Sequence, residues 1–337
     1  MSKQNSPLVL GTERISKLLT QYAIPAIIAM TASSLYNMAD SIFIGHGVGP
    51  LAISGLALTF PLMNLAAAFG SLVGVGASTL VSVKLGQKDY EGANKVLGNV
   101  LVLNVVLGRA FTLVFMLLLD PILYFFGASE NTISYARDYM NVILIGNVIT
   151  HMYLGLNAVL RSSSFPKLAM YATLASVVIN CVLNPLFIFG FGWGIKGSAW
   201  ATVISQVISL TGQLIHFSRP KELLHFKKGI YRLKSEIVKG ILYIGMSPFL
   251  MNLCACLIVI LINRGLKEHG GDMAIGAYGI VNRVVFRFIM IIMGFNQGMQ
   301  PIAGYNFGAR QYSRVTEVTK LTMKWAIGVA TTGFLLC

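Results

Sequence analysis

Residues 18–44 read LLTQYAIPAIIAMTASSLYNMADSIFI, and this stretch carries a single charged side chain, that of Asp40. About 20 apolar residues in helical conformation are enough to cross a bilayer. The whole chain has the same character, because 55% of its 337 residues are hydrophobic and only 11% are charged. Soluble domains carry about 25% charged residues. We therefore predict an all-α polytopic membrane protein whose solvent is lipid.

Long apolar segments recur along the chain. We predict spans at residues 18–44, 52–82, 97–119, 134–160, 167–190, 196–217, 237–263, 273–303 and 314–337. The net charge of +14 does not indicate nucleic acid binding, because the basic residues lie between these segments rather than on one helix. By our count, nineteen of the 26 Lys and Arg fall in the N-terminus and the even-numbered connections. The positive-inside rule therefore predicts a cytoplasmic N-terminus.

The sequence gives no sign of a cleaved leader or of an enzyme. The first apolar stretch is too long for a signal peptide and lacks a small-residue cleavage site. Cys181, Cys254 and Cys256 lie inside predicted spans, where buried free thiols are favoured over a disulfide or a zinc site. The chain contains no phosphate-binding loop and no hydrolase motif. We predict no enzymatic activity and no cofactor.

The chain repeats itself at an offset of 222 to 223 residues. The matched segments are AISG at 52–55 with AIGA at 274–277, LGQKDY at 85–90 with FGARQY at 307–312, Gly76 with Gly298, and Pro25 with Pro248. Several weak matches in one register indicate an internal duplication. An offset of six spans means that both repeats enter the membrane from the same side, so they are parallel repeats.

The duplication predicts three parts of the chain. They are an N-terminal six-helix lobe at 1–217, a cytoplasmic amphipathic connector at 218–235, and a C-terminal lobe at 236–337. We expect two parallel six-helix repeats with twelve spans in roughly 440 residues when complete, of which about nine spans and three helices of the second lobe lie in this chain. Apolar residues alternating with lysines suggest that the connector forms a short helix on the membrane surface.

Asp40 is the carboxylate that lies deepest in a predicted span. Burying a charge in lipid costs at least about 2.5–3.5 kcal/mol, so its presence needs a reason. Ser33, Tyr36, Asn37 and Asp40 share one helix face, and such a polar stripe favours a water-accessible cavity. We interpret Asp40 as a proton or cation site. The alternative is a structural salt bridge or a cap near the outer mouth.

Polar residues also lie within the fifth and sixth predicted spans. Asn180 and Asn184 lie one turn apart, so they can coordinate a cation or hold a carboxylate. Ordinary hydrogen bonding between helices is the alternative for this pair. The sixth span adds Thr202 and Gln206.

The fourth span carries Asn157 and His151. An intramembrane histidine is either a hydrogen-bonded core residue or a proton carrier, and the sequence leaves both readings of His151 open.

The second half is polar in a different way. Arg283 and Arg287 lie one turn apart in the eighth span and precede Gln297. These arginines could bind an anionic ligand, or they could reach backbone carbonyls where the two halves meet. Asn263 occupies the place of Asp40 under an offset of 223 residues, so that position keeps its polarity and loses its charge. Coupling to an ion should therefore be asymmetric between the halves.

Three segments of the chain resemble the multidrug and toxic compound extrusion (MATE) family, in its DinF/MepA-like branch. They are SLYNMADSIFIG at 34–45, NCVLNPLFIFG at 180–190 and QGMQPIAGYNFGA at 297–309. The resemblance implies two six-helix lobes around a central cavity that opens alternately to each side. It implies export of amphiphilic, mostly cationic compounds in exchange for H⁺ or Na⁺. It further implies a monomer in the bacterial cytoplasmic membrane.

The resemblance also suggests which residues act. It places a cation network at Asp40, Asn180 and Thr202, with Tyr36 and Asn157 beside it. The branch usually has Asp where this chain has Asn184, which weakens the case for a Na⁺ site at Asp40, Asn180 and Asn184. We expect the substrate cavity to include Tyr36, Asn37, Asn157, His151, Gln206 and Gln297, and we name Arg283, Arg287 and Asn263 as candidates in the second lobe.

Two other functions stay open at this point. A lipid-linked oligosaccharide flippase of the wider superfamily would need cationic residues for a pyrophosphate, and Arg109, Arg283 and Arg287 keep that reading alive. A membrane receptor or enzyme would not need a duplicated half, and the chain shows no catalytic constellation.

Overall fold

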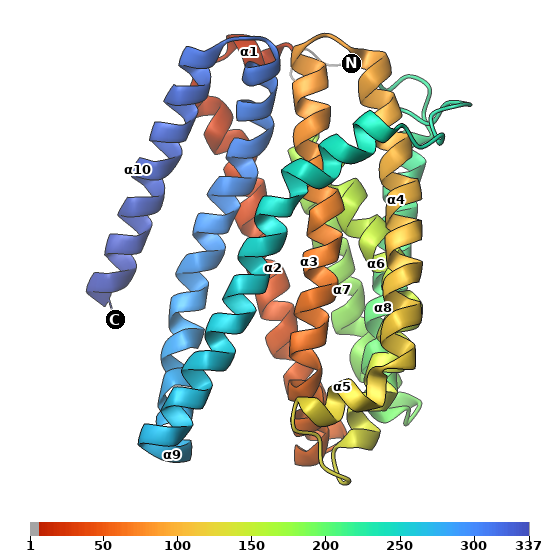
Figure 1. The fold of residues 1–337 in the computed structure, drawn as a ribbon, viewed down its shortest axis with the longest axis vertical. Coiled ribbons are helices and arrows are strands. Elements are labelled where there is room, and N and C mark those ends of the chain that lie inside the picture. The colour runs from red at the N-terminus through yellow and green to blue at the C-terminus, as the bar shows by residue number, and fades with distance from the viewer. Residues whose placement is uncertain (1–6, 337) are drawn as a thin grey trace.

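The computed structural model describes residues 7–336, without the side chains of residues 37, 259–260, 263–264, 266–284 and 336. Every regular element in this range is helical. The helices are α1 (Val9–Thr12), α2 (Ile15–Gly47), α3 (Pro50–Gly86), α4 (Tyr90–Leu117), α5 (Leu119–Phe125), α6 (Ile133–Ser162), α7 (Pro166–Pro185), the π-helical turn η2 (Leu186–Gly190), α8 (Gly194–Phe217), α9 (Ser235–Gly308) and α10 (Tyr312–Leu336). The long helices run from one end of the bundle to the other, and the first arm of α9 crosses it obliquely (Figure 1).

Six helical segments among the described residues are long and apolar enough to cross a membrane. They are Ile15–Gly47, Pro50–Gly86, Tyr90–Leu117, Ile133–Ser162, Pro166–Gly190 and Ser235–Ile258. The predicted first, second, fourth and fifth spans lie within these segments, and the predicted third and seventh spans overlap them but extend past their ends. The other three predicted ranges lie in α8, in the second part of α9 and in α10, so the total of nine spans stays a prediction.

The outer surface of the bundle is apolar, as expected for a protein in lipid. Phe125 and Leu117 are 86% and 75% exposed, and Leu113 and Tyr243 are exposed as well. In water such side chains would be expected to pack inside, whereas hydrocarbon is as apolar as they are.

The chain reverses direction inside α9. A straight helix of this length would extend about 110 Å. Yet a Cβ placed on Gly76 would meet the carbonyl oxygen of Ile241 near the start of α9, and one placed on Gly308 at its end would meet that of Val83. Both ends of α9 therefore pack against the same part of α3, and Figure 1 shows its two arms joined at the far end. The sequence predicts two spans separated by a connection here, whereas helical conformation continues through the reversal.

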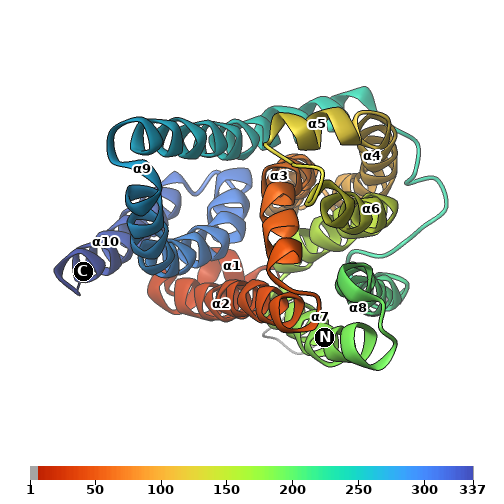
Figure 2. The same ribbon diagram turned by 90° about the horizontal axis from the view of Figure 1, so that it is seen from below.

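Two apolar clusters show where the halves of the chain meet. The first joins Leu19 and Val81 to Ile241, Ile302 and Val318, so it includes α2 and α3 together with α9 and α10. The second lies toward the opposite end and is built from residues between Ile44 and Val203. Among the described residues, none from α9 or α10 enters this second cluster. The helices of the two halves are therefore packed together at one end, and Figure 2 views the bundle from the other end.

The internal repeat has a structural counterpart in two tight turns. Lys88 follows α3 with φ of 60°, and Arg310 follows α9 with φ of 59°. A positive φ is uncommon for residues other than glycine, so the same conformation at positions 222 residues apart supports the duplication. After the first turn, Asp89 caps α4 by accepting a hydrogen bond of 2.8 Å from the Gly92 N–H. That bond and the ammonium group of Lys84 lower the pKa of Asp89.

The two repeated turns also contact each other reciprocally. A Cβ on Gly86 would meet the carbonyl oxygen of Tyr305, and a Cβ on Gly308 would meet that of Val83. Gly308 is the repeat equivalent of Gly86, and Tyr305 is the equivalent of Val83. The contact is therefore the same when the halves are exchanged, as expected of parallel repeats related by an axis along the membrane normal.

The connector between the halves is not helical, which corrects the short surface helix expected from its composition. Residues 218–234 form turns and bends before α9 begins. Asn94 of α4 donates to the Leu223 carbonyl at 3.2 Å and accepts from the His225 N–H at 2.9 Å. Leu224, between these two residues, is buried. Because side chains of α4 satisfy the connector's backbone, the segment does not need hydrogen bonds within a helix of its own.

Candidate functional site

Asp40 joins three helices at the centre of the N-terminal half. Its side chain on α2 is only 5% exposed. The Oδ1 oxygen accepts a hydrogen bond of 2.5 Å from Nδ2 of Asn184 on α7 and another from Oγ of Ser198 on α8. The carboxylate that the sequence singles out is therefore held by neutral donors. Among the described residues, no basic side chain pairs with it, so the predicted alternative of a structural salt bridge does not apply to this arrangement.

A second set of polar groups lies one helical turn away. Asn180 donates to Oγ1 of Thr202 at 3.2 Å, and the Tyr36 hydroxyl lies 2.7 Å from the same oxygen. Asn184 links the two sets, because its Nδ2 is also 3.5 Å from Oδ1 of Asn180. Asn180 and Asn184 share one face of α7, just as Tyr36 and Asp40 share one face of α2. The four residues predicted for coupling are thus brought together with Tyr36.

The local backbone helps to present Asn184. Pro185 ends α7 immediately after it, and a π-helical turn, η2, follows. Proline cannot donate an intrahelical hydrogen bond, and π-helical turns are frequent at functional sites. The chain departs from regular α-helical geometry beside Asp40 and its partners.

One atom of this cluster has no partner. Oδ1 of Asn184 has no hydrogen-bond partner, although the residue is fully buried. A buried acceptor without a partner costs about 1–3 kcal/mol, so it suggests a missing ligand or water. The neighbouring oxygens belong to Asp40, Asn180, Ser198 and Thr202. Carboxylate, amide and hydroxyl oxygens are suitable ligands for a hard cation. The carboxylate can instead take up a proton, while the amide and hydroxyl oxygens accept hydrogen bonds.

The other predicted residues in the N-terminal half make separate contacts. Asn157 donates to the Ala169 carbonyl at 2.9 Å and accepts from Arg161 at 2.5 Å. Oε1 of Gln206 accepts from Thr150 at 2.5 Å. Neither is hydrogen-bonded to the Asp40 cluster.

His151 lies in the packing between α6 and α3. Its side chain is 1% exposed, and Nε2 lies 3.0 Å from the Ala66 carbonyl, while Nδ1 is buried without a partner. Phe111 lies beside the ring at a centroid distance of 6.2 Å. The imidazole is thus a hydrogen-bonded core residue in this arrangement, the first of the two readings that the sequence left open.

The predicted residues of the second half are only partly placed. Nε2 of Gln297 on α9 lies 3.7 Å from the sulfur of Met30 on α2, so it reaches across to the first half. Arg287 is exposed on α9. The side chains of Asn37, Asn263 and Arg283 lie outside the described residues.

Ser198 is the site residue that the sequence analysis missed. Its hydroxyl donates to Asp40, and its carbonyl accepts from Thr202 one turn later. The signal was a polar stripe at helical spacing along α8, formed by Ser198, Thr202, Ser205 and Ser209. Serine is common in membrane helices as a packing residue, so the stripe alone would not have singled out Ser198.

Comparison with known families identifies the chain. Residues 25–186 and 244–337 match the model of the MatE family. The chain belongs to the MatE family. The first matched range contains Asp40, Asn180 and Asn184, whereas Ser198 and Thr202 lie between the two ranges.

Relatives with assigned names are similar over most of the chain. The multidrug export protein MepA of Staphylococcus haemolyticus is 30% identical over 309 residues, which cover 92% of this chain and 68% of that protein. MepA of Staphylococcus aureus strain N315 is 30% identical over 323 residues, covering 96% of this chain and 70% of that protein. The MatE family resemblance proposed from three short segments is therefore confirmed over the chain as a whole.

Solved structures of MatE relatives share the fold. An outward-facing multidrug resistance MATE transporter of the MOP superfamily aligns with a TM-score of 0.91 and 26% identity, covering 98% of this chain and 73% of that one. A MOP superfamily transporter from Pyrococcus furiosus, for which a reversed polarity of the binding pocket suggests a different function, aligns with a TM-score of 0.90 and 26% identity, covering 96% of this chain and 72% of that one. The chain is thus a multi-pass membrane transporter and not an enzyme.

Proposed function

We propose that this MatE family transporter is a secondary antiporter that exports amphiphilic, mostly cationic compounds in exchange for H⁺ or Na⁺. The observation that carries the proposal is the buried Asp40 carboxylate. Among the described residues its hydrogen-bond donors are neutral, and one of them, Asn184, has an unpartnered side-chain oxygen. The negative charge of a carboxylate in this setting can be neutralised by one positive charge. A proton, a metal cation or a cationic drug can supply that charge, and only one of them at a time.

The geometry suggests how binding of an ion at Asp40 would change the hydrogen bonds between the helices. Ionised Asp40 accepts hydrogen bonds from Asn184 and Ser198, and these bonds tie α2 to α7 and α8. A protonated carboxyl group instead carries its own donor, which can bond to the Asn184 oxygen that now lacks a partner. Ion loading therefore exchanges one set of interhelical bonds for another. Pro25 interrupts α2 and lets its outer part respond by bending.

The halves and their orientation follow from the same proposal. We assign residues 1–217 and 236–337 to two lobes that rock against each other, joined by the connector at 218–235. Residues 7–14, the turn at 87–89, the connector and the turn at 309–311 gather at one end of the bundle (Figure 1), and they carry Arg14, Lys88, Arg310 and six basic residues of the connector. The positive-inside rule supports a cytoplasmic location for that end. We further propose a monomer in the bacterial cytoplasmic membrane.

The proposal is tested by efflux of a fluorescent cationic dye from vesicles that contain the protein. H⁺ and Na⁺ gradients are imposed one at a time, and a neutral dye of similar size serves as the control substrate. We expect efflux to depend on one of the two gradients and to stop when that gradient is dissipated. Efflux that requires ATP, or dye binding without any gradient-driven movement, would contradict antiport.

Replacing Asn184 with aspartate should change the coupling ion. Asn184→Asp places a second carboxylate beside Asp40, and two carboxylates attract a hard cation more strongly than one. We expect efflux to become dependent on Na⁺, with the Na⁺ concentration for half-maximal rate lowered by roughly tenfold. Asn157→Asp is the matched control, since Asn157 is hydrogen-bonded to Arg161 and not to Asp40. An Asn184→Asp variant whose Na⁺ dependence equals that of the control would argue against a cation at this oxygen cluster.

A further inference from the structure

We propose that the cytoplasmic end of the transporter is held closed by two reciprocal latches. In each latch, the segment that leads into the first long helix of one half, α2 or α9, is bound by the other half. The inference rests on the proposed alternating access between two lobes. The first latch is formed by residues 10–13 with Asn306 and Arg314, and the second by residues 223–234 with Asn94 and Asn99. Both must open before a compound can enter the central cavity from the cytoplasm.

The first latch binds the N-terminal segment to the second half. Nη2 of Arg314, on α10, donates to the carbonyl oxygens of Glu13 at 2.6 Å and of Leu10 at 3.2 Å. Asn306, near the end of α9, donates to the same Leu10 carbonyl at 2.9 Å and accepts from Nε of Arg314 at 2.9 Å. Asn306 is fully buried and Leu10 is 1% exposed, whereas Arg314 is partly exposed and lines a polar hollow together with Glu13.

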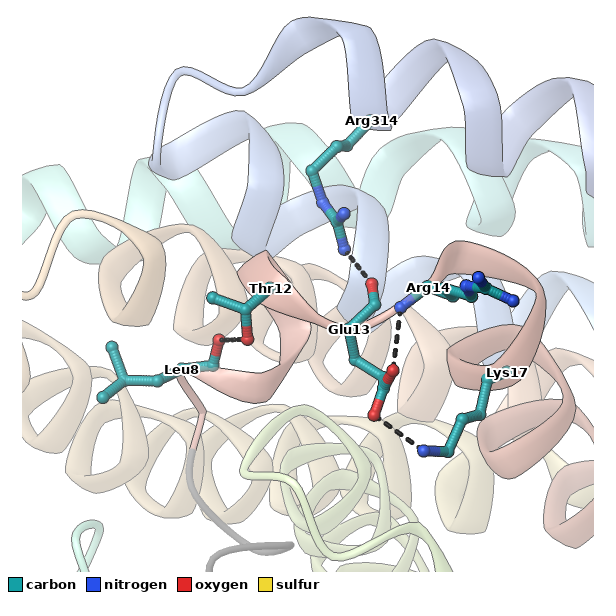
Figure 3. Close-up of polar contacts among 6 residues, drawn as sticks. All are labelled: Leu8, Thr12, Glu13, Arg14, Lys17 and Arg314. Atoms are coloured by element: carbon teal, nitrogen blue, oxygen red, sulfur yellow. Dashed lines mark hydrogen bonds and ion pairs between the residues drawn. The ribbon is translucent and has the colours of Figure 1, made fainter.

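Figure 3 shows how Arg314 reaches this segment. The Glu13 carboxylate turns away and binds Lys17 at 2.7 Å and the Arg14 N–H at 3.2 Å. The guanidinium group therefore meets the backbone carbonyl of Glu13 and not its side chain. Because the acceptors are backbone carbonyls, the whole charged contribution to this latch comes from one residue of the second half.

The second latch binds the connector to the first half. Asn99 of α4 accepts from the Lys234 N–H at 3.0 Å and donates to the carbonyls of Arg232 at 3.2 Å and Ile230 at 3.4 Å. One turn earlier, Asn94 makes the pair of bonds to the connector described above. Asn99 is fully buried, and Ile230 is buried beside it. Together these two amides fix the segment that leads directly into α9.

The two latches occupy equivalent places in the repeat. Shifting residues 10–13 by 222 gives residues 232–235, which is the end of the connector. α4 and α10 are likewise equivalent, since each follows one of the two matched turns. The side chains differ, however, because Thr316 and Leu321 stand where Asn94 and Asn99 would be expected in α10. The corresponding segment of each half is thus bound by unrelated side chains of the other half, which favours a role for the binding itself over a remnant of duplication.

The position of the latches connects them with access to the cavity. Just inside them, Ser82 of α3 is fully buried against Gly304 of α9, where a Cβ on the glycine would lie 2.8 Å from the serine Cβ. Ser82 lies in the seam that must part if the cytoplasmic end opens. A cysteine at position 82 is nearly the same size as serine, so it reports opening of the seam with little disturbance of the packing.

The test measures how fast N-ethylmaleimide labels Ser82→Cys in a background without the four native cysteines. We expect Arg314→Gln and Asn99→Leu each to accelerate labelling by roughly tenfold to a hundredfold, the factor that corresponds to one strong buried hydrogen bond. Arg232→Gln is the matched control, since only the backbone carbonyl of Arg232 takes part in a latch. It removes a similar charge from the same end of the protein and should leave the labelling rate unchanged.

A second reporter separates opening of the seam from loss of the fold. Ser162 is also fully buried but lies within the first half, where it bonds to carbonyls of its own helix. If the latch variants accelerate labelling of Ser162→Cys as much as labelling of Ser82→Cys, the latch proposal is overturned. It is equally overturned if they accelerate the labelling of neither cysteine. Labelling needs no gradient and no drug, so a failure of the efflux experiments would leave this measurement interpretable.

Discussion

The Asp40→Asn variant is expected to lose gradient-driven efflux of cationic dyes, by about a hundredfold or more, while it stays folded and inserted. Asparagine has nearly the same shape as aspartate, and its oxygen can still accept the bonds that Asn184 and Ser198 donate. What the variant lacks is the charge. The site can then neither bind an exchanging cation nor release one, so drug movement is no longer coupled to the gradient.

The measurement follows dye efflux in everted vesicles under an imposed pH difference. A membrane potential of about 150 mV supplies about 3.5 kcal/mol for each charge moved. Exchange of one monovalent cationic dye for one proton moves no net charge, so the pH difference alone should drive it. Asp120→Asn is the matched control, because Asp120 is half exposed and paired with Arg137 away from the cluster. Efflux at the wild-type rate in Asp40→Asn would remove Asp40 from the mechanism and shift attention to His151 or to a site driven only by Na⁺.

The site residues that stand out by their spacing along a single helix could be predicted from the sequence. Asp40 stands out because charge is rare in a span, and Asn180 and Asn184 stand out because they are one turn apart. Thr202 was placed beside them by the family resemblance, and the structure brings all four together. Ser198 could not be singled out, since its role depends on how α8 is rotated against α2. That rotation is a tertiary property which no single helix encodes.

The fold shows the same division between local and tertiary information. Hydropathy predicted nine spans, of which six have counterparts among the segments that can cross a membrane. Repeated segments predicted the duplication that the turns at Lys88 and Arg310 now support. The connector was different, because its alternation of apolar residues and lysines favours a surface helix when it is read alone. Asn94 and Asn99, more than 100 residues earlier in the chain, satisfy its backbone instead. Local propensity is a weak guide where distant side chains compete for the same backbone groups.

Enlarging the two glycines at the reciprocal turns should prevent closure of the end of the bundle that we propose to be cytoplasmic. A Cβ on Gly86 would overlap the Tyr305 carbonyl, and one on Gly308 would overlap the Val83 carbonyl. The obstacle in each case is backbone, which cannot move aside as a flexible side chain can. Overpacking of a tight contact costs about 1–3 kcal/mol. The combined Gly86→Ala and Gly308→Ala variant should therefore favour separation of the halves by roughly thirtyfold or more, if the two costs add.

We expect the double variant to lose most dye efflux, since a transporter that cannot close on the cytoplasmic side cannot hold the outward-facing state. Gly212→Ala is the matched control, because a Cβ on this glycine of α8 meets nothing within 4 Å. In a helix interior this control should be neutral or stabilising by up to about 1 kcal/mol. Efflux and thermal unfolding are measured for both variants in the same membranes. If the double variant exports dye as fast as the Gly212→Ala control, the close approach of the two turns has no role in the transport cycle, and this end of the bundle is kept closed by other contacts, such as the two latches.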